Sequence, residues 1–197
     1  RDYFFDIRSK NIFILSFLFT LFCIIWTLAG GFGTPIALFA GFIFGKWLGI
    51  TILIIGMTIG ATMLYMFANF FLKDYVYEKF SKRFSFLITK FEKSEFTYLL
   101  IYRFIGGIPF VLSNILPCIF NVRVTNFFLA TFFGLIPQLF LVVSIGSGLE
   151  KIIDQNIEAP SIKDLIFSPE IYIPLIIFFV FVIFTIILKK NFYKKES

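Results

Sequence analysis

Long apolar stretches without charge alternate with short charged segments along this chain. The uncharged stretches are residues 12–45, 47–72, 104–122, 124–149 and 171–188. One bilayer crossing takes about 20 consecutive apolar residues. The pattern therefore predicts an all-α integral membrane protein with about four transmembrane helices, organised as one membrane domain over residues 12–188.

The Lys and Arg residues of the short segments predict the orientation of these helices. Residues 1–11, the loop 73–95 and the tail 189–197 are rich in Lys and Arg, whereas the loop 150–170 carries two Lys against five acidic residues. Positively charged short loops tend to stay in the cytoplasm. We therefore expect both termini and loop 73–95 to be cytoplasmic, and loop 150–170 to be external.

Two apolar stretches have lengths that do not suit a whole number of crossings. Residues 30–72 are too long for one crossing, and two crossings would return the chain to the outside; residues 96–149 pose the same difficulty. Re-entrant hairpins over about 33–49 and about 97–121, each followed by one crossing, satisfy both length and charge. Because re-entrant backbone needs protein or water around it, the two hairpin tips are expected to meet inside the protein.

The two hairpin regions also resemble each other in sequence. Residues 33–61, moved forward by 74 positions, fall on residues 107–135 without a gap. The best matches are Gly33 with Gly107, Pro35 with Pro109, and Gly60 with Gly134. Two similar apolar units on either side of a charged loop predict an inverted repeat, an architecture of many transporters. Chance similarity between two membrane segments is the alternative.

Composition narrows the classes of function. The mean hydropathy is +0.93, and the net charge of +6 comes mostly from Lys and Arg that flank apolar segments, so no nucleic-acid partner is expected. The chain has no His, the commonest catalytic base and metal ligand. No metal-ligand cluster or nucleophile–base pair is visible, so we expect neither an enzyme nor a cofactor. Cys23 and Cys118 lie in apolar runs and are expected to be core thiols.

Arg103 is the strongest candidate for a binding residue. A charged side chain within apolar sequence costs on the order of 3 kcal/mol on insertion scales, so it needs a function or a partner. A guanidinium group is suited to bidentate binding of phosphate. The alternative is that Arg103 extends to the cytoplasmic interface or pairs with Glu92 or Glu95, which precede it by about two to three helical turns.

The other candidates surround the same region. Ser113 and Asn114 fall near the presumed turn of the second hairpin, where they either bind a head group or cap broken helices. Helices that start after Gly33 and Gly107 would direct their positive ends inward, which suits an anion. Arg123 either assists Arg103 in binding the phosphate or only anchors the helices at the cytoplasmic interface. The predicted substrate-binding set is Arg103, Pro109, Ser113, Asn114, Arg123, Gly33, Pro35 and Gly107.

A spaced motif in the second unit resembles a known family. Its elements are Arg103-Phe104, Pro109-Phe110, Asn114, Thr131, Gly134 and Pro137. The chain resembles the DedA superfamily, also called SNARE-associated or VTT-domain proteins, and within it the bacterial Golgi-protein-like branch, over about residues 30–150. The resemblance implies two facing re-entrant hairpins, the bacterial inner membrane and the movement of lipids across it. The DedA branch has acidic residues in its first hairpin that are linked to proton coupling, whereas this chain has no Asp or Glu between Asp6 and Asp74.

These observations lead to one function and two alternatives. The expected function is a lipid transporter or scramblase that moves a phospholipid or polyprenyl-phosphate, with the phosphate head group bound at Arg103. The alternatives are an ion- or proton-coupled secondary transporter for a small solute, and a non-transporting membrane scaffold. The expected partners are membrane lipids with phosphate head groups, and homo-oligomerisation is left open.

Overall fold

The computed structural model describes residues 2–82, 94–105 and 109–155, with single positions at 85, 88, 91 and between 169 and 183. The helices are α1 (Asp2–Leu28), α2 (Gly33–Phe71), α3 (Lys73–Phe80), α5 (Glu95–Ile105), α6 (Phe110–Ile115), the 3-10 helix η1 (Leu116–Phe120) and α7 (Val124–Gln155). In the described residues, three segments are long and apolar enough to cross a membrane: Asn11–Leu28, Gly33–Phe71 and Val124–Glu150. The prediction of an all-α membrane protein is confirmed. The predicted crossing over 171–188 lies mostly outside the described residues.

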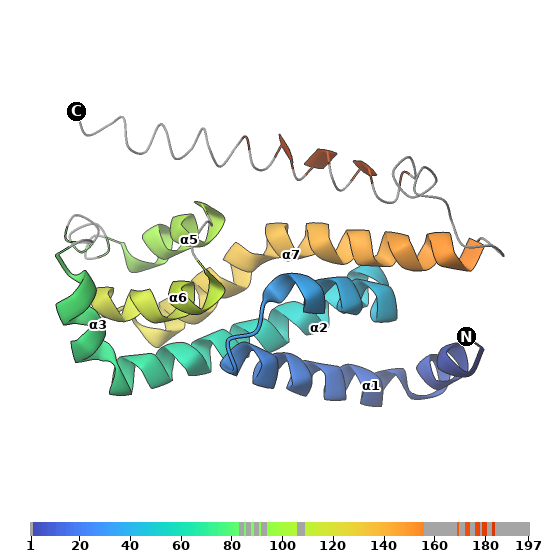
Figure 1. Cartoon of the computed structure of the whole chain (residues 1–197), viewed down its shortest axis with the longest axis horizontal. Coiled ribbons are helices and arrows are strands. Elements are labelled where there is room, and N and C mark those ends of the chain that lie inside the picture. Colours follow the sequence, from blue (N-terminus) through green and yellow to red (C-terminus); the bar gives the residue numbers. More distant parts are fainter. Residues whose placement is uncertain are drawn as a thin grey trace.

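Helix α2 is two antiparallel arms joined at Gly45. This residue has φ 72° and ψ 179°, a conformation that glycine reaches without the steric penalty of a Cβ atom. A Cβ placed on Gly49 would lie 2.6 Å from the carbonyl oxygen of Ala40, so the two arms pack tightly just beyond the turn. Figure 1 shows the first arm, residues 33–44, folding back along the start of the second arm, residues 46–71.

Helix α1 and the first arm of α2 also run antiparallel, joined by residues 29–32 (Figure 1). Trp26 Nε1 donates a hydrogen bond of 3.0 Å to the carbonyl oxygen of Phe32 across this connection. The predicted hairpin over about 33–49 contains the reversal at Gly45. The structure has a further reversal at residues 29–32, and we call α1 together with residues 33–44 the first hairpin. Apolar length alone did not locate the reversals, because the sharpest one depends on the backbone conformation of Gly45.

The second half of the chain repeats this arrangement. Helices α5 and α6 form the hairpin, α6 continues into η1, and the chain turns at Asn121, which has φ 48°, before α7 begins. A Cβ on Gly134 of α7 would lie 2.6 Å from the Cβ of Arg103 on α5. At the matching position of the first half, a Cβ on Gly60 of α2 would lie 2.7 Å from the Cβ of Thr27 on α1. The structural repeat therefore pairs α1 with α5 and the second arm of α2 with α7.

Each hairpin packs against the long helix of the other half. In one cluster, Ile36, Ala37 and Ala40 of the first arm of α2 share a buried core with Leu139 and Val143 of α7. In the other, Tyr65 and Ala68 of the second arm of α2 share a core with Cys118 and Val122, and the hydroxyl of Tyr65 donates to the carbonyl oxygen of Val122. Lipid is as apolar as these side chains, so the contacts depend on close packing of small residues rather than on the hydrophobic effect.

The positions of α1 and α3 bear on the topology predicted from charge, which stays a prediction. The start of α1 and helix α3 lie at opposite ends of the long axis, along which α1, the second arm of α2 and α7 run (Figure 1). If these helices cross the bilayer along this axis, the start of α1 and helix α3 meet opposite membrane faces, whereas the charge pattern predicts one face for residues 1–11 and loop 73–95. Because α1 and residues 33–44 run antiparallel, the start of α1 and the end of residues 33–44 point toward the same end of the molecule (Figure 1). Re-entrance of either hairpin stays a prediction.

Candidate functional site

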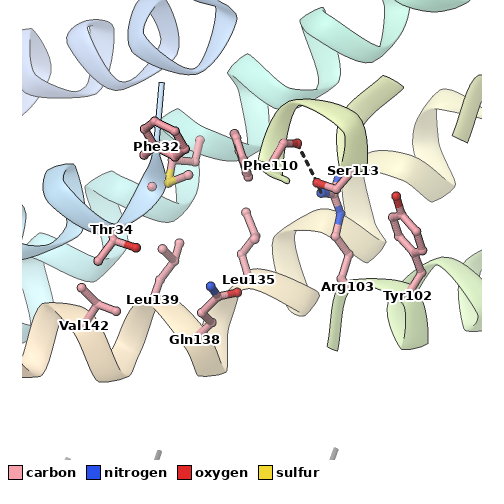
Figure 2. A pocket seen from close by; sticks show the side chains of 12 residues that line it. Phe32, Thr34, Tyr102, Arg103, Phe110, Ser113, Leu135, Gln138, Leu139 and Val142 are labelled. Carbon is pink, nitrogen blue, oxygen red and sulfur yellow. Dashed lines mark hydrogen bonds between the residues drawn. The ribbon is translucent and has the colours of Figure 1, made fainter. Parts of the chain in front are cut away.

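A polar pocket of about 190 Å³ lies where the first residues of α2 meet α5, α6 and α7. Its walls include Gly33 and Thr34 of α2, Tyr102 and Arg103 of α5, Phe110 and Ser113 of α6, and Leu135, Gln138 and Leu139 of α7, most of which Figure 2 labels. Sites for whole drug-sized ligands begin at about 300 Å³. The pocket therefore suits a small polar group rather than an entire lipid.

The side chain of Arg103 is buried beside this pocket and held by three neutral oxygen atoms. Its Nη1 donates to Ser113 Oγ at 3.0 Å, and its Nη2 donates to Asn114 Oδ1 at 2.7 Å and to Thr131 Oγ1 at 3.0 Å. The guanidinium also lies 5.1 Å from the ring centre of Phe127. Ser113 in turn donates to the carbonyl oxygen of Phe110 at 2.7 Å, which Figure 2 shows as a dashed line. Helices α5, α6 and α7 are thus joined at one cation.

The positive charge of Arg103 is not paired with a carboxylate anywhere in the described part of the chain. Arg103 is only 6% exposed, and an isolated charge in an apolar interior is costly to bury. Hydrogen bonds to a charged group return only about 1.5–3 kcal/mol each. The ring of Phe127 adds a cation–π contact of about 2 kcal/mol when desolvated. The site therefore keeps a net positive charge that an anion in the pocket would neutralise.

The cluster also has donor capacity to spare. A guanidinium carries five N–H groups, and three of them are used in the bonds to Ser113, Asn114 and Thr131. Within the described residues, Arg103 Nε has no hydrogen-bond partner, and neither do the buried Nδ2 of Asn114 and the hydroxyl of Tyr102. Buried polar atoms are nearly always satisfied in folded proteins, so several unsatisfied ones close together indicate a place for a ligand or water.

Apart from Arg123, the predicted site residues fall into three groups. Arg103, Ser113 and Asn114 are joined by hydrogen bonds, and Gly33 lies on the pocket wall with Arg103 and Ser113. Pro35 and Pro109 are exposed residues at the starts of α2 and α6 and are not among the lining residues. Gly107 lies outside the described residues.

Arg123 lies away from the pocket and binds Glu95. Its Nε donates to Glu95 Oε2 at 3.3 Å, its backbone N–H donates to the same oxygen at 3.0 Å, and Asn126 adds a third bond at 2.7 Å. Partial burial favours the neutral form of Glu95, but these hydrogen bonds and the charge of Arg123 outweigh it and hold the pKa of Glu95 below its usual range. Glu95 is therefore the partner of Arg123 rather than of Arg103, and Glu92 lies outside the described residues.

Two polar residues of α7 complete the site but were not predicted to belong to it. Thr131 bonds Arg103 directly, and Gln138 lines the pocket as an exposed side chain. Both lie on one helical face with Gly134, which contacts Arg103, at spacings of three, four and seven residues. A polar stripe at helical spacing within an apolar helix could have identified them.

The polar cluster belongs to the second half of the repeat only. Under the shift of 74 residues, Asn114 corresponds to Ala40 and Thr131 corresponds to Met57. The counterpart of Arg103 in the structural repeat is the uncharged Thr27. The first half contributes instead the start of α2, through Gly33 and Thr34. The two halves are therefore alike in backbone arrangement and unlike in chemistry, with one charged pocket between them.

Comparison with known proteins covers the same region. Residues 31–148 match the VTT domain, a stretch that contains every residue lining the pocket. The chain is 28% identical to a transmembrane protein 41 homolog of Dictyostelium discoideum over 167 residues, which are 79% of this chain and 48% of that protein. It is 25% identical to a transmembrane protein 41 homolog of Caenorhabditis elegans over 136 residues, 66% of this chain and 55% of that protein.

A third relative is the uncharacterized protein YqeD of Bacillus subtilis (strain 168), which is 30% identical over 118 residues, 57% of each chain. The chain spans about half the length of these relatives. No solved structure matches it. The VTT-domain match extends over more than half of the chain and agrees with the family that the spaced Arg, Pro, Asn, Thr and Gly residues indicated. This chain is therefore a membrane protein that belongs to the VTT-domain, or DedA, family.

Proposed function

We propose that the protein moves phosphate-bearing lipids across the bilayer, with the phosphate held at Arg103 while its head group passes through the membrane. The observation that supports this proposal most directly is the unpaired charge of a buried arginine on the wall of a polar pocket. A phosphate would accept hydrogen bonds from the guanidinium N–H groups that remain free. The pair would also neutralise two charges that are each costly at membrane depth.

The size of the pocket decides which part of a lipid it can accept. A volume of about 190 Å³ accommodates a phosphate group with some water, and the acyl or prenyl chains would remain in the surrounding lipid. Apolar residues are exposed on α1, α2 and α7, such as Phe17, Phe67 and Phe133. They give the outer surface the apolar character that contact with acyl or prenyl chains requires. A phospholipid and a polyprenyl-phosphate share this phosphate chemistry, and both are included in the proposal.

Proton coupling through the pocket is not part of this proposal. The pocket-lining residues include Tyr102, Gln138 and Thr34 as polar side chains, and none of the lining residues is an acid. A carboxylate that changes its protonation state is the usual means of coupling proton movement to transport. We therefore propose passive equilibration of the lipid, driven by its concentration difference between the leaflets.

The test is translocation of fluorescent lipid in liposomes that contain the purified full chain. Arg103→Ala should lower the rate by about 10- to 100-fold, the equivalent of losing one charge-assisted hydrogen bond in the rate-limiting state. Arg103→Lys should be nearly as impaired, because an ammonium keeps the charge but not the planar set of donors. Arg123→Ala is the matched control, since it removes the same charge from an exposed site away from the pocket.

Folded yield and thermal stability are measured for each variant, because Arg103 also joins three helices. Transport by folded Arg103→Ala at the wild-type rate would refute the proposal. Equal losses in Arg103→Ala and Arg123→Ala would show that the assay reports net charge or folding rather than the pocket. Parallel measurements with a labelled phospholipid and a labelled polyprenyl-phosphate distinguish the two lipid classes.

A further inference from the structure

A second cavity, larger and apolar, lies between the second arm of α2 and α7. It has a volume of about 350 Å³ and is lined by Trp47, Ile50 and Ile54 of α2 and by Phe132, Ile136 and Phe140 of α7, among others. It shares no lining residue with the polar pocket at Arg103. The groove between α2 and α7 is thus a separate feature of the fold, on another face of α7.

The interior of this groove offers almost nothing to a polar ligand. Apart from the indole of Trp47, the polar side chain among the lining residues is Thr51, whose hydroxyl donates to the carbonyl oxygen of Trp47 at 2.9 Å and is satisfied by its own helix. The lining positions on α2 run from Trp47 to Ile55, a rise of about 12 Å. An apolar groove that follows the helix over this length offers a hydrocarbon chain a surface of matching polarity.

One end of the groove carries a cation. Lys46 Nζ lies 5.7 Å from the ring centre of Trp47 and 5.6 Å from the ring centre of Phe140, and the two rings are 5.9 Å apart. Lys46 follows the turn at Gly45, so it stands at the end of the long arm rather than within it. No carboxylate of the described residues pairs with it, and it is the one charged residue between residues 12 and 72.

We propose that this groove binds an anionic phospholipid, with one acyl chain along α2 and α7 and the phosphate at Lys46. The apolar lining of the groove complements the acyl chain of such a lipid, and the ammonium at the end of the groove complements its phosphate. The two aromatic rings hold the ammonium at the mouth of the groove, where a head group at the membrane interface would meet it. This site is independent of lipid movement through the Arg103 pocket.

Trp47 supplies a direct probe, because the chain has only two Trp residues. In a Trp26→Phe background, the fluorescence of Trp47 is measured in phosphatidylcholine vesicles that contain phosphatidylglycerol brominated on its acyl chains, and separately with brominated phosphatidylcholine. We expect half-maximal quenching at an about fivefold lower fraction of the anionic lipid, from one Lys near a membrane surface. Lys46→Gln should abolish this preference, and Ile136→Phe should weaken it by filling the groove.

Simple interfacial anchoring of Lys46 and Trp47 makes different predictions. Equal quenching by the two lipids in the Trp26→Phe background would overturn the proposal, and so would a preference that survives Lys46→Gln or is unchanged by Ile136→Phe. Native mass spectrometry of the unmodified chain is independent of the Trp26 substitution. It should show phosphatidylglycerol bound to the unmodified chain and to the Arg123→Ala variant, but not to the Lys46→Gln variant. Loss of the bound lipid from both variants, or from neither, would count against the site.

Discussion

Asn114 accepts a hydrogen bond of 2.7 Å from the Nη2 atom of Arg103, across the two arms of the second hairpin. The amide is neutral, so it fixes the position of the guanidinium without cancelling its charge. A carboxylate at the same place would fix the position equally well and neutralise the cation. The identity of residue 114 therefore decides whether the pocket can attract an anion.

Asn114→Asp should separate the structural role of this contact from its role in binding. We expect the variant to fold with near-normal stability, because an ion pair replaces the hydrogen bond, and to lose phosphate binding and transport. Asn114→Leu should instead destabilise the fold by about 1–3 kcal/mol, since Arg103 loses an acceptor. Thermal unfolding in detergent and lipid translocation in liposomes check both expectations. Wild-type transport by Asn114→Asp would mean that the charge of Arg103 is not used.

Gly134→Ala should disturb the site through packing. The new Cβ would lie 2.6 Å from the Cβ of Arg103, so α5 must move away from α7, at a cost of about 1–3 kcal/mol. Gly60→Ala is the matched control from the other half, where the new Cβ would lie 2.7 Å from the Cβ of Thr27. Both should lower thermal stability, but only Gly134→Ala should reduce transport per folded molecule. Equal reductions would argue that general loosening of the helices is responsible.

The ion pair of Glu95 with Arg123 should make stability depend on pH. The pKa of Glu95 is lowered in the folded protein, so its contribution is present above the pKa of the unfolded chain and is lost as pH falls through the folded pKa. The difference in melting temperature between wild type and Glu95→Gln should therefore shrink between about pH 6 and about pH 3. Glu78→Gln, which removes the same charge from an exposed position on α3, is the control. A difference that does not change with pH would exclude the pair as its source.

The arrangement of α1 predicts which segments meet the same membrane face. In a background without Cys23 and Cys118, Asn11→Cys and Lys82→Cys should react with an impermeant maleimide from opposite sides of oriented vesicles. The reason is that the start of α1 and helix α3 lie at opposite ends of the long axis (Figure 1). Labelling of both positions from one side would support the topology predicted from charge and would require α1 to cross the bilayer completely.

The sequence determined the features that depend on local composition. Stretches such as 124–149 are too apolar for water and long enough for a bilayer, which predicts membrane helices without any knowledge of packing. Arg103 stood out for the same local reason, because a cation in apolar sequence is costly wherever the chain folds. The matching Gly and Pro residues at a shift of 74 positions likewise indicated the repeat before its contacts were known.

Tertiary structure decided everything that depends on residues distant in the chain. Thr131 reaches Arg103 from a position 28 residues away, and Glu95 binds Arg123 across the same separation. The choice between these partners depends on how α5 lies on α7, which the close approach at Gly134 sets and no local pattern encodes. The reversal between the two arms of α2 depended likewise on one backbone conformation at Gly45. Hydropathy measures the length of apolar sequence, but direction and contact arise only when the helices pack.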